Sequence, residues 1–442
     1  MQARLGRYRW RSACGWWLLL LTAAAVPLAV ALVELPASRS ALIEFGAGLG
    51  LLGLGLMVVQ SFTTGRHVWV APSFGADNLS HFHRHLGLLA APLLLAHPLV
   101  LFAGDPDFLR FLDPRDDWLR AISLWGLLLL LLLITVSSLW RKHLGLSYEI
   151  WRLLHGGLAL LLLVMGLGHA LMVGHYVHSP WQQLLLAAWV GLAVFLILSV
   201  RLLRPWRNRR RPWEVLSVSP ERGDCWTLSF RPVGHEGMHF QPGQYGWFTL
   251  GETPFSLQQH PFSFACAAGE KDLCFTASSS GDFTSSLSSV KPGTLAWIEG
   301  PMGSFMPDQD QAVGLFLVAG GIGVTPMMSM LRTFRNVGDR RRIRLICANP
   351  SQDEITFFEE LAELESALNL DVIHVLEEPP SDWSGETGLV DDELLDRCLA
   401  GLDEPLQYMT CGPEPVMDLV ESTLRKRGVD WRRIFSERFE IV

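Results

Sequence analysis

Four histidines with a repeated spacing are the residues in this sequence best suited to chemistry. His83 and His97 lie 14 positions apart, and so do His155 and His169. In an α-helix, 14 steps of about 100° end about 40° short of four turns, so both members of a pair project from one face, about 21 Å apart. Each pair occupies an apolar stretch, where an ionisable side chain is costly and usually functional.

Imidazole nitrogen is a common axial ligand of haem iron. If the two helices run in the same direction, His83 faces His155 at one level and His97 faces His169 at another. We predict two b-type haems, each held between two imidazoles. Iron with both axial positions filled by protein has no open site for substrate, so these haems would carry single electrons. His85 is an alternative to His83, although it lies about 120° from His97 around a helix, and the choice stays open.

The segments that carry these histidines are long and apolar. Nearly half of the 442 residues are hydrophobic, and they are concentrated before residue 203. An apolar segment near 20 residues matches the thickness of the bilayer core. Six such segments predict six transmembrane helices, at approximately residues 16–33, 41–62, 86–102, 122–140, 153–173 and 181–200.

Basic residues indicate how these helices are oriented. Arginine and lysine precede the first span, lie between the second and third and between the fourth and fifth, and follow the sixth, with six arginines in residues 201–211. Because basic residues resist translocation, both termini are predicted to be cytoplasmic. The seven cysteines all fall on that side, which implies no disulfide framework. A cleaved signal peptide at residues 1–33 is an alternative that leaves the later spans unchanged.

The second half of the chain, residues 212–442, has the composition of a soluble protein. Alternating stretches broken by Gly and Pro turns predict a small antiparallel β-barrel; they are residues 226–231, 245–250 and 273–278. Apolar strands that each precede a helical pattern predict a doubly wound parallel sheet; they are residues 315–319, 343–348 and 407–411. Gly320, Gly321 and Gly323 follow the first of these strands, where backbone amides and a helix N-terminus can meet a pyrophosphate.

Five motifs in this half occur in an order that resembles ferredoxin reductase-type flavin domains. They are His260-Pro261-Phe262-Ser263, Gly281-Asp282-Phe283-Thr284, Glu299-Gly-Pro-Met-Gly303, Gly320-Gly-Ile-Gly-Val-Thr-Pro326 and Cys411-Gly412-Pro413. Together with six spans and paired histidines, they make the whole chain resemble a bacterial member of the NADPH oxidase and ferric reductase superfamily. The resemblance implies a transmembrane haem domain at residues 1–211, an FAD-binding β-barrel at 212–310 and an NAD(P)-binding α/β domain at 311–442.

The resemblance also implies roles for the motif residues. Phe262 and Ser263 would lie against the flavin ring, while His260 and the amides around Thr284 would serve the FAD phosphates; Pro261, Gly281, Asp282 and Phe283 complete this predicted set. The NAD(P) site would be formed by Gly320, Gly321, Gly323, Thr325, Pro326, Gly412 and Pro413. Cys411 would flank the nicotinamide and Phe439 would cover the flavin until nicotinamide displaces it, so these two are the predicted catalytic residues.

Several of these residues also have structural interpretations. Thr284 fits a helix N-cap, Cys411 an inert buried thiol, and Phe439 a packing residue at the end of a last strand. NADPH and NADH both stay open as coenzymes. The stretch after the second strand, residues 349–352, contains no arginine, but its Ser351 offers a hydroxyl group to a 2′-phosphate.

These features predict electron transfer across a bacterial cytoplasmic membrane. A hydride passes from NAD(P)H to FAD, and single electrons then pass through the two haems to an acceptor on the outer side. The expected partners are the lipid bilayer, NAD(P)H and the acceptor, with no nucleic acid and no obligatory protein partner.

Dioxygen is the predicted acceptor, and a ferric chelate is the alternative. Dioxygen would yield superoxide at the haem edge, where Arg39 could contribute positive charge; Arg39 could equally be a loop residue that meets lipid phosphate. Leu101 stands where oxygen-reducing members of the family often carry a further histidine, which favours a ferric chelate, and His175 and His178 could meet such a complex. A nucleotide-regulated transporter without haem is a third interpretation, under which the histidine spacing would be a coincidence.

Overall fold

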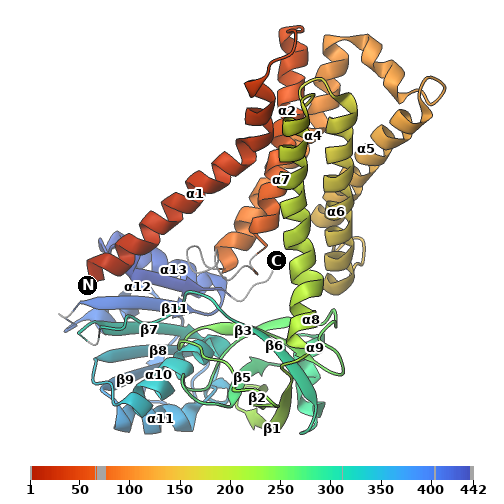
Figure 1. Ribbon diagram of the computed structural model, residues 1–442. Coiled ribbons are helices and arrows are strands. Elements are labelled where there is room, and N and C mark those ends of the chain that lie inside the picture. The colour runs from red at the N-terminus through yellow and green to blue at the C-terminus, as the bar shows by residue number, and fades with distance from the viewer. Residues whose placement is uncertain (1, 65, 67–75, 311, 403–404, 439–442) are drawn as a thin grey trace. The chain divides into compact units, whose positions relative to one another are not determined.

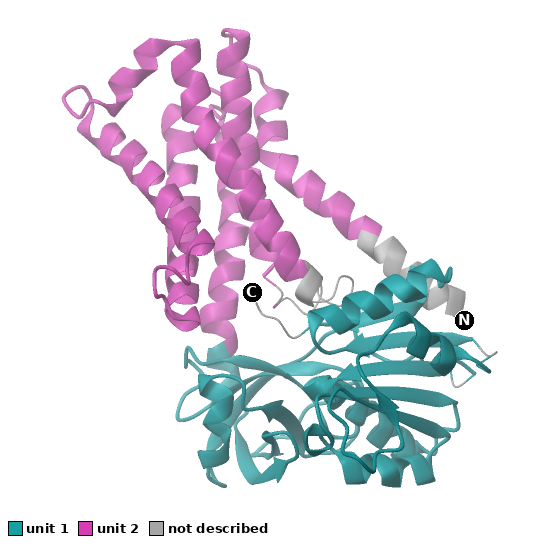
Figure 2. Cartoon of the chain, turned by 180° about the vertical axis from the view of Figure 1, so that it is seen from behind, with its two compact units in different colours: residues 1–11, 71–77, 205–442 teal, residues 12–70, 78–204 magenta. Residues whose placement is uncertain are grey.

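The computed structural model describes residues 2–64, 66, 76–310, 312–402 and 405–438. They form two compact units (Figure 2), one made of residues 12–70 and 78–204, the other of residues 1–11, 71–77 and 205–442. The predicted domain boundaries at residues 211 and 310 stay predictions.

The first unit is a bundle of long apolar helices. Among the described residues, six helices are long and apolar enough to cross a membrane, as the sequence predicts, and the chain is a multi-pass membrane protein. They are α1 (Gln2–Val33), α2 (Ala41–Phe62), α4 (Ala76–Gly104), α5 (Trp118–Leu139), α6 (Tyr148–Val173) and α7 (Pro180–Leu198). A short 3-10 helix, η1 (Pro106–Leu112), precedes α5, and a π-helical turn, η2 (Ser199–Leu203), follows α7.

A row of glycines lets α2 approach α4 closely. A Cβ atom on Gly46 would stand 3.0 Å from the Leu101 side chain, one on Gly50 2.7 Å from the His97 ring, and one on Gly53 2.6 Å from the Leu94 side chain. Small residues at such spacing bring helix backbones together in membranes. The backbone carbonyls of α2 therefore come within reach of side chains on α4.

In the second unit, α8 (Arg204–Asn208) precedes a curled antiparallel sheet. Its strands are β1 (Trp213–Glu221), β2 (Cys225–Pro232), β3 (Tyr245–Leu250), β4 (His260–Ser263), β5 (Leu273–Ser278) and β6 (Leu295–Met302). The order is β4-β3-β6-β1-β2-β5, and a bridge from Phe264 to Phe275 brings the two edges together around a core rich in phenylalanine. The predicted antiparallel barrel is thus confirmed as a half-barrel.

A parallel sheet follows, with helices on both faces (Figure 1). Its strands are β7 (Gly314–Gly320), β8 (Ile343–Asn349), β9 (Leu370–Leu376), β10 (Glu386–Thr387), β11 (Leu406–Cys411) and β12 (Ile434–Glu437), in the order β10-β9-β8-β7-β11-β12. One face packs on α10 (Thr325–Val337) and α11 (Phe358–Ala367), and the other on α12 (Asp392–Leu399) and α13 (Glu414–Lys426).

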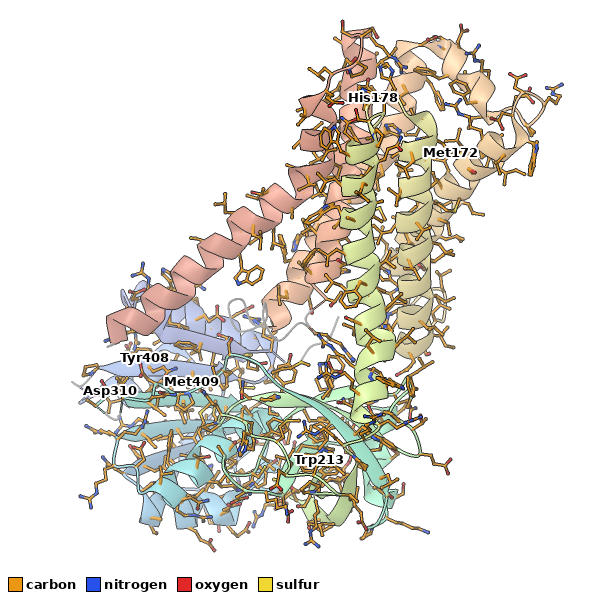
Figure 3. All side chains as sticks on the ribbon, in the orientation of Figure 1. Met172, His178, Trp213, Asp310, Tyr408 and Met409 are labelled. Atoms are coloured by element: carbon orange, nitrogen blue, oxygen red, sulfur yellow. The ribbon has the colours of Figure 1, made fainter. Side chains whose placement is uncertain are left out.

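Neighbouring residues of β11 illustrate the two faces of this sheet. Met409 belongs to the core beneath α10 and α11, whereas Tyr408 packs with the residues beneath α12 and α13 (Figure 3). Both faces are covered, which explains why the strands read as continuous apolar runs rather than as alternating ones. The predicted doubly wound fold is confirmed.

Candidate functional site

The four histidines form two pairs of facing rings inside the helix bundle. His83 of α4 and His155 of α6 have ring centroids 6.1 Å apart, with an interplanar angle of 64°. His97 and His169, one level further along the same two helices, have centroids 6.2 Å apart at 78°. The pairing is the one that the 14-residue spacing predicts, while the role of these residues as metal ligands stays a prediction.

Hydrogen bonds from α2 fix the orientation of the α4 rings. Nδ1 of His97 lies 2.8 Å from the carbonyl oxygen of Gly46, and Nδ1 of His83 lies 3.2 Å from that of Gln60. Because a carbonyl only accepts, Nδ1 carries the proton in both rings, and the lone pair is left on Nε2, where a metal can bind. Such a second partner is the usual support of a metal-binding histidine.

A hydroxyl group serves the same purpose for one ring of α6. Nδ1 of His155 lies 3.1 Å from Oγ of Ser138 on α5. That hydroxyl donates its proton to the carbonyl of Ile134, at 2.6 Å, so its lone pair is free to accept from the imidazole. The lone pair of His155 is then also left on Nε2.

Space for a flat group exists beside the α6 histidines. A Cβ atom placed on Gly156, Gly157 or Gly168 would meet nothing within 4 Å. His85, the alternative at the first level, is exposed, and its Nδ1 lies 2.7 Å from the carbonyl of His81 on its own helix. The structure therefore places His83, and not His85, beside His155.

The supports on α2 and α5 were not predicted from the sequence. Gly46 and Gln60 are themselves 14 residues apart, which mirrors the histidine spacing on the antiparallel helix α4. Gly46 and Gly50 form a Gly-x-x-x-Gly pair, a known signal of close helix packing. This signal is visible in the sequence and would have pointed to α2 as the neighbour of α4.

The loops at the end of the bundle nearest His97 and His169 contain a polar cluster. The carboxylate of Glu44 accepts from the Tyr176 hydroxyl at 3.0 Å, and burial, followed by Glu44, raises the pKa of Tyr176 to about 12. His178, in the loop between α6 and α7 (Figure 3), has Nε2 3.7 Å from the Glu34 carboxylate. Burial, followed by the charge of Arg39, lowers the pKa of His175, which keeps this imidazole neutral.

In the half-barrel, the structure brings the two predicted flavin motifs together. The His260 ring stacks on Phe283, with centroids 3.9 Å apart, and Phe262 stacks on Phe275 at 4.3 Å. The Ser263 hydroxyl is buried and has no hydrogen-bond partner among the described residues. A buried hydroxyl usually has a hydrogen-bond partner. The Ser263 hydroxyl therefore fits a site in which the polar ring of a bound cofactor supplies that partner.

The Gly281–Thr284 segment opens the short helix α9 (Asp282–Ser285). Gly281 occupies the N-cap position, and Thr284 lies three residues later with its hydroxyl 3.0 Å from the Gly281 amide nitrogen. The interpretation of Thr284 as an N-cap is therefore wrong. The reason is local, since its hydroxyl reaches back to the amide that precedes the helix.

Two glycine turns meet at the carboxyl edge of the parallel sheet. A Cβ atom on Gly320 would stand 2.6 Å from the Pro413 ring, and one on Gly323 would overlap the Cys411 carbonyl oxygen. The turns follow β7 and β11, which are neighbours in the sheet although three strands and three α-helices lie between them in the sequence. The strand order reverses between these two strands, and nucleotides bind at such a switch point.

The other predicted coenzyme residues lie at the same edge. Gly321 has φ +52°, Gly412 has φ +157°, and Thr325 and Pro326 begin α10 and are buried. The Cys411 side chain is fully buried. Phe439 lies outside the described residues. The last described strand, β12, pairs with β11 so that Glu437 lies opposite Cys411.

Two family models match the chain. Residues 49–166 match the ferric reductase like transmembrane component, and residues 317–422 match the oxidoreductase NAD-binding domain. One chain thus joins a ferric reductase-like membrane component to a ferredoxin reductase-type FAD/NAD domain, which is the combination that the sequence resemblance implies, and the protein is an oxidoreductase.

Related proteins resemble part of the chain. NADH-cytochrome b5 reductase 1 of Debaryomyces hansenii is 31% identical over 184 residues, which are 41% of this chain and 63% of the relative. The protein of that name from Cryptococcus neoformans var. neoformans is 31% identical over 170 residues, 36% of this chain and 58% of the relative. The chain thus spans less than two thirds of either relative.

Two solved structures are similar to the chain over different shares of its length. The FAD/NAD-binding domain of a nitric oxide dioxygenase from Vibrio cholerae O1 biovar El Tor is 22% identical with a TM-score of 0.46, over 52% of this chain and 98% of that domain. A flavohemoglobin from Malassezia yamatoensis is 18% identical with a TM-score of 0.49, over 89% of this chain and 98% of that one.

Replacing Gly323 with Ala tests whether the meeting point of the two turns is the coenzyme site. The added Cβ would overlap the Cys411 carbonyl, so the turn after β7 must move away from β11. We expect FAD content to be unchanged and flavin reduction by NAD(P)H, followed by anaerobic stopped-flow absorbance, to slow at least about tenfold, which corresponds to ~1.4 kcal/mol.

The control for this substitution is Ser366→Ala on α11, whose hydroxyl contacts only a carbonyl of its own helix. Dithionite should reduce both variants as it does the wild type. A Gly323→Ala protein that NAD(P)H reduces at the wild-type rate would place the coenzyme elsewhere.

Proposed function

We propose that this protein carries electrons from cytoplasmic NAD(P)H through FAD and two b-type haems to a one-electron acceptor on the other side of the membrane. The observation that carries the proposal is the pair of facing imidazoles at each of two levels. Bound FAD accepts a hydride and releases single electrons, and haem iron held by two imidazoles passes on one electron at a time.

The ring separations fit an iron atom between each pair. Two metal–nitrogen bonds of about 2 Å, and about 1 Å from each nitrogen to its ring centre, predict centroids about 6 Å apart. The separations are 6.1 and 6.2 Å. His83 with His155 would hold the inner haem and His97 with His169 the outer one, with the glycines of α6 leaving room for the macrocycles.

The remaining site residues lie in residues 212–442, which we call the reductase half. They have proposed roles at the flavin and at the coenzyme. Ser263 and Phe262 would face the flavin, with His260, Pro261, Gly281, Asp282, Phe283 and Thr284 holding the rest of FAD. The turns after β7 and β11 would hold the coenzyme, with Cys411 at the nicotinamide. Phe439 would cover the flavin when no coenzyme is bound.

Gly50→Ala tests the outer haem without touching a proposed ligand. The new Cβ would stand 2.7 Å from Nδ1 of His97 and displace the ring from Gly46. We expect the haem content, measured as the pyridine haemochromogen, to fall from two per chain towards one, with FAD content and NAD(P)H-driven flavin reduction retained.

Gly48→Ala, on the same helix, is the matched control, because a Cβ there meets nothing within 4 Å. It should retain two haems. Two haems in the Gly50→Ala protein as well would contradict the assignment of His97, and a colourless wild-type protein would favour the transporter without haem.

The turn after β8 favours NADH over NADPH. Oγ of Ser351 lies 3.3 Å from the Glu354 carboxylate, so the hydroxyl proposed to meet a 2′-phosphate is already engaged. A carboxylate after the second strand accepts from a ribose 2′-hydroxyl and repels a phosphate in its place. The related reductases named above are also called NADH-dependent by their names.

Glu354→Gln removes this charge and leaves the shape unchanged. We expect the ratio of kcat/KM for NADPH to that for NADH to rise at least about tenfold, or ~1.4 kcal/mol. Glu363→Gln, on the exposed side of α11, should leave the ratio unchanged. An unchanged ratio in the Glu354 variant would separate coenzyme choice from this turn.

Dioxygen is the proposed acceptor and superoxide the proposed product. The loops and helix ends proposed to face outwards contain seven carboxylates and four arginines; these are Glu34, Glu44, Asp105, Asp107, Asp113, Asp116, Asp117, Arg39, Arg110, Arg115 and Arg120. A negative surface repels anionic ferric chelates and does not affect a neutral molecule. His178, which could meet a ferric complex under the alternative, has its Nε2 3.7 Å from the Glu34 carboxylate.

The acceptor is tested with the purified protein and NADH at several ionic strengths. Cytochrome c reduction that superoxide dismutase suppresses should account for turnover and should not depend on salt. Reduction of ferric citrate should be slower and should rise with salt as the repulsion is screened. Turnover that requires the chelate and yields no superoxide would support the ferric reductase alternative.

A further inference from the structure

Three side chains on one face of α10 bond to the chain that follows Ser263. Ser329 donates to the Cys266 carbonyl at 2.7 Å, Arg332 donates to the Ala265 carbonyl at 2.7 Å, and Thr333 accepts from the Ala268 amide at 2.8 Å. Residues three and four apart share a helix face. We call Ser329, Arg332 and Thr333 the α10 clamp.

Ser329 of the α10 clamp is buried, whereas Arg332 and Thr333 are partly buried, and all three side chains are hydrogen-bonded. Ser329 has no exposed surface. The Arg332 side chain is 16% exposed and makes two further bonds to the Glu360 carboxylate of α11, at 2.7 and 2.5 Å. Thr333 donates its own proton to the Ser329 carbonyl, so its lone pair is directed at Ala268. Hydrogen bonds from a charged group are about twice as strong as those between neutral groups. Arg332 therefore contributes most to the strength of the α10 clamp.

The α10 clamp lies between the two candidate ligand sites. Helix α10 begins at Thr325, directly after the glycine turn of the coenzyme edge, and Ser329 lies one turn further on. On the other side, Ala265 is two residues beyond Ser263, at the end of the strand that carries the flavin motif. The clamp therefore joins a helix that starts at the coenzyme edge to a segment that starts within a few residues of Ser263.

Hydride transfer depends strongly on such a connection. The reacting atoms must lie about 3–3.5 Å apart, and an error of about 1 Å can lower the rate by about 10². We propose that Arg332, with Ser329 and Thr333, is a positioning residue that sets the distance between the nicotinamide and the flavin. This inference rests on the proposed function, because it requires that both cofactors bind where described.

Arg332→Leu tests the inference in the full-length protein reconstituted with FAD. Anaerobic stopped-flow reduction by NADH, at saturating coenzyme, should be slowed about 10-fold to 100-fold. The affinity for NADH, the FAD content, the reduction by dithionite and the amplitude of the reaction should be unchanged. NADH deuterated at the transferred position should give a larger isotope effect than in the wild type, because hydride transfer then limits the rate more fully.

Two further variants and a control separate positioning from folding. Ser329→Ala and Thr333→Val each remove one bond and should slow the same step less, while Arg332→Lys should recover part of the rate. Arg397→Leu is the control. Arg397 lies on α12, which covers the face of the parallel sheet opposite α10, and the substitution breaks an exposed ion pair with Glu386 and should have no effect. A loss of amplitude without a change in rate would mean that Arg332 only stabilises the fold and would overturn the inference.

The outcome also distinguishes this inference from the proposed function. A wild-type flavin that NADH cannot reduce would mean that the proposed function fails. A wild type that NADH reduces rapidly, with an Arg332→Leu protein that is reduced equally rapidly, would leave the function intact and remove Arg332 from its mechanism.

Discussion

An imidazole inside the bilayer needs a partner for each of its nitrogens, and this requirement organises the membrane unit. Water is absent there, so each Nδ1 proton must be accepted by another part of the protein. For two of the four rings the acceptor is a main-chain carbonyl of α2, and for a third it is the hydroxyl of Ser138. The close approach of α2 to α4, and hence the glycines of α2, follow from this need.

The reductase half has a different requirement. Two proposed ligands, FAD and the coenzyme, would be held by separate sheets and must still touch each other. Each sheet carries its own candidate site, at the end of β4 and at the carboxyl edge of β7 and β11. The parallel sheet reverses its strand order where the two glycine turns meet. Helix α10 starts at this edge and bonds back to the half-barrel, so one helix belongs to both sites.

Much of this arrangement could be predicted from the sequence, because it depends on patterns of apolar residues and on local motifs. The six spans, the pairing of histidines by level and the strand–helix alternation are all of this kind. The carbonyl partners of His83 and His97 are not, because every helical residue has a carbonyl and only packing decides which one is reached. Ser329, Arg332 and Thr333 likewise resemble the polar face of any amphipathic helix, since their partners lie about 65 residues away in the chain.

The use of main-chain oxygens beside His83 and His97 limits what genetic variation can do to them. Any amino acid at position 46 or 60 brings the same carbonyl, so no single substitution deletes these acceptors. His83 has a further contact, 3.2 Å from the Thr63 hydroxyl, that a substitution can remove. For His97, side-chain bulk on α2 is the remaining route, and it acts by distance rather than by loss of a polar group. Variants that disturb the His97 imidazole are therefore expected to arise from added volume at small residues, where a change from glycine to alanine is usually regarded as mild.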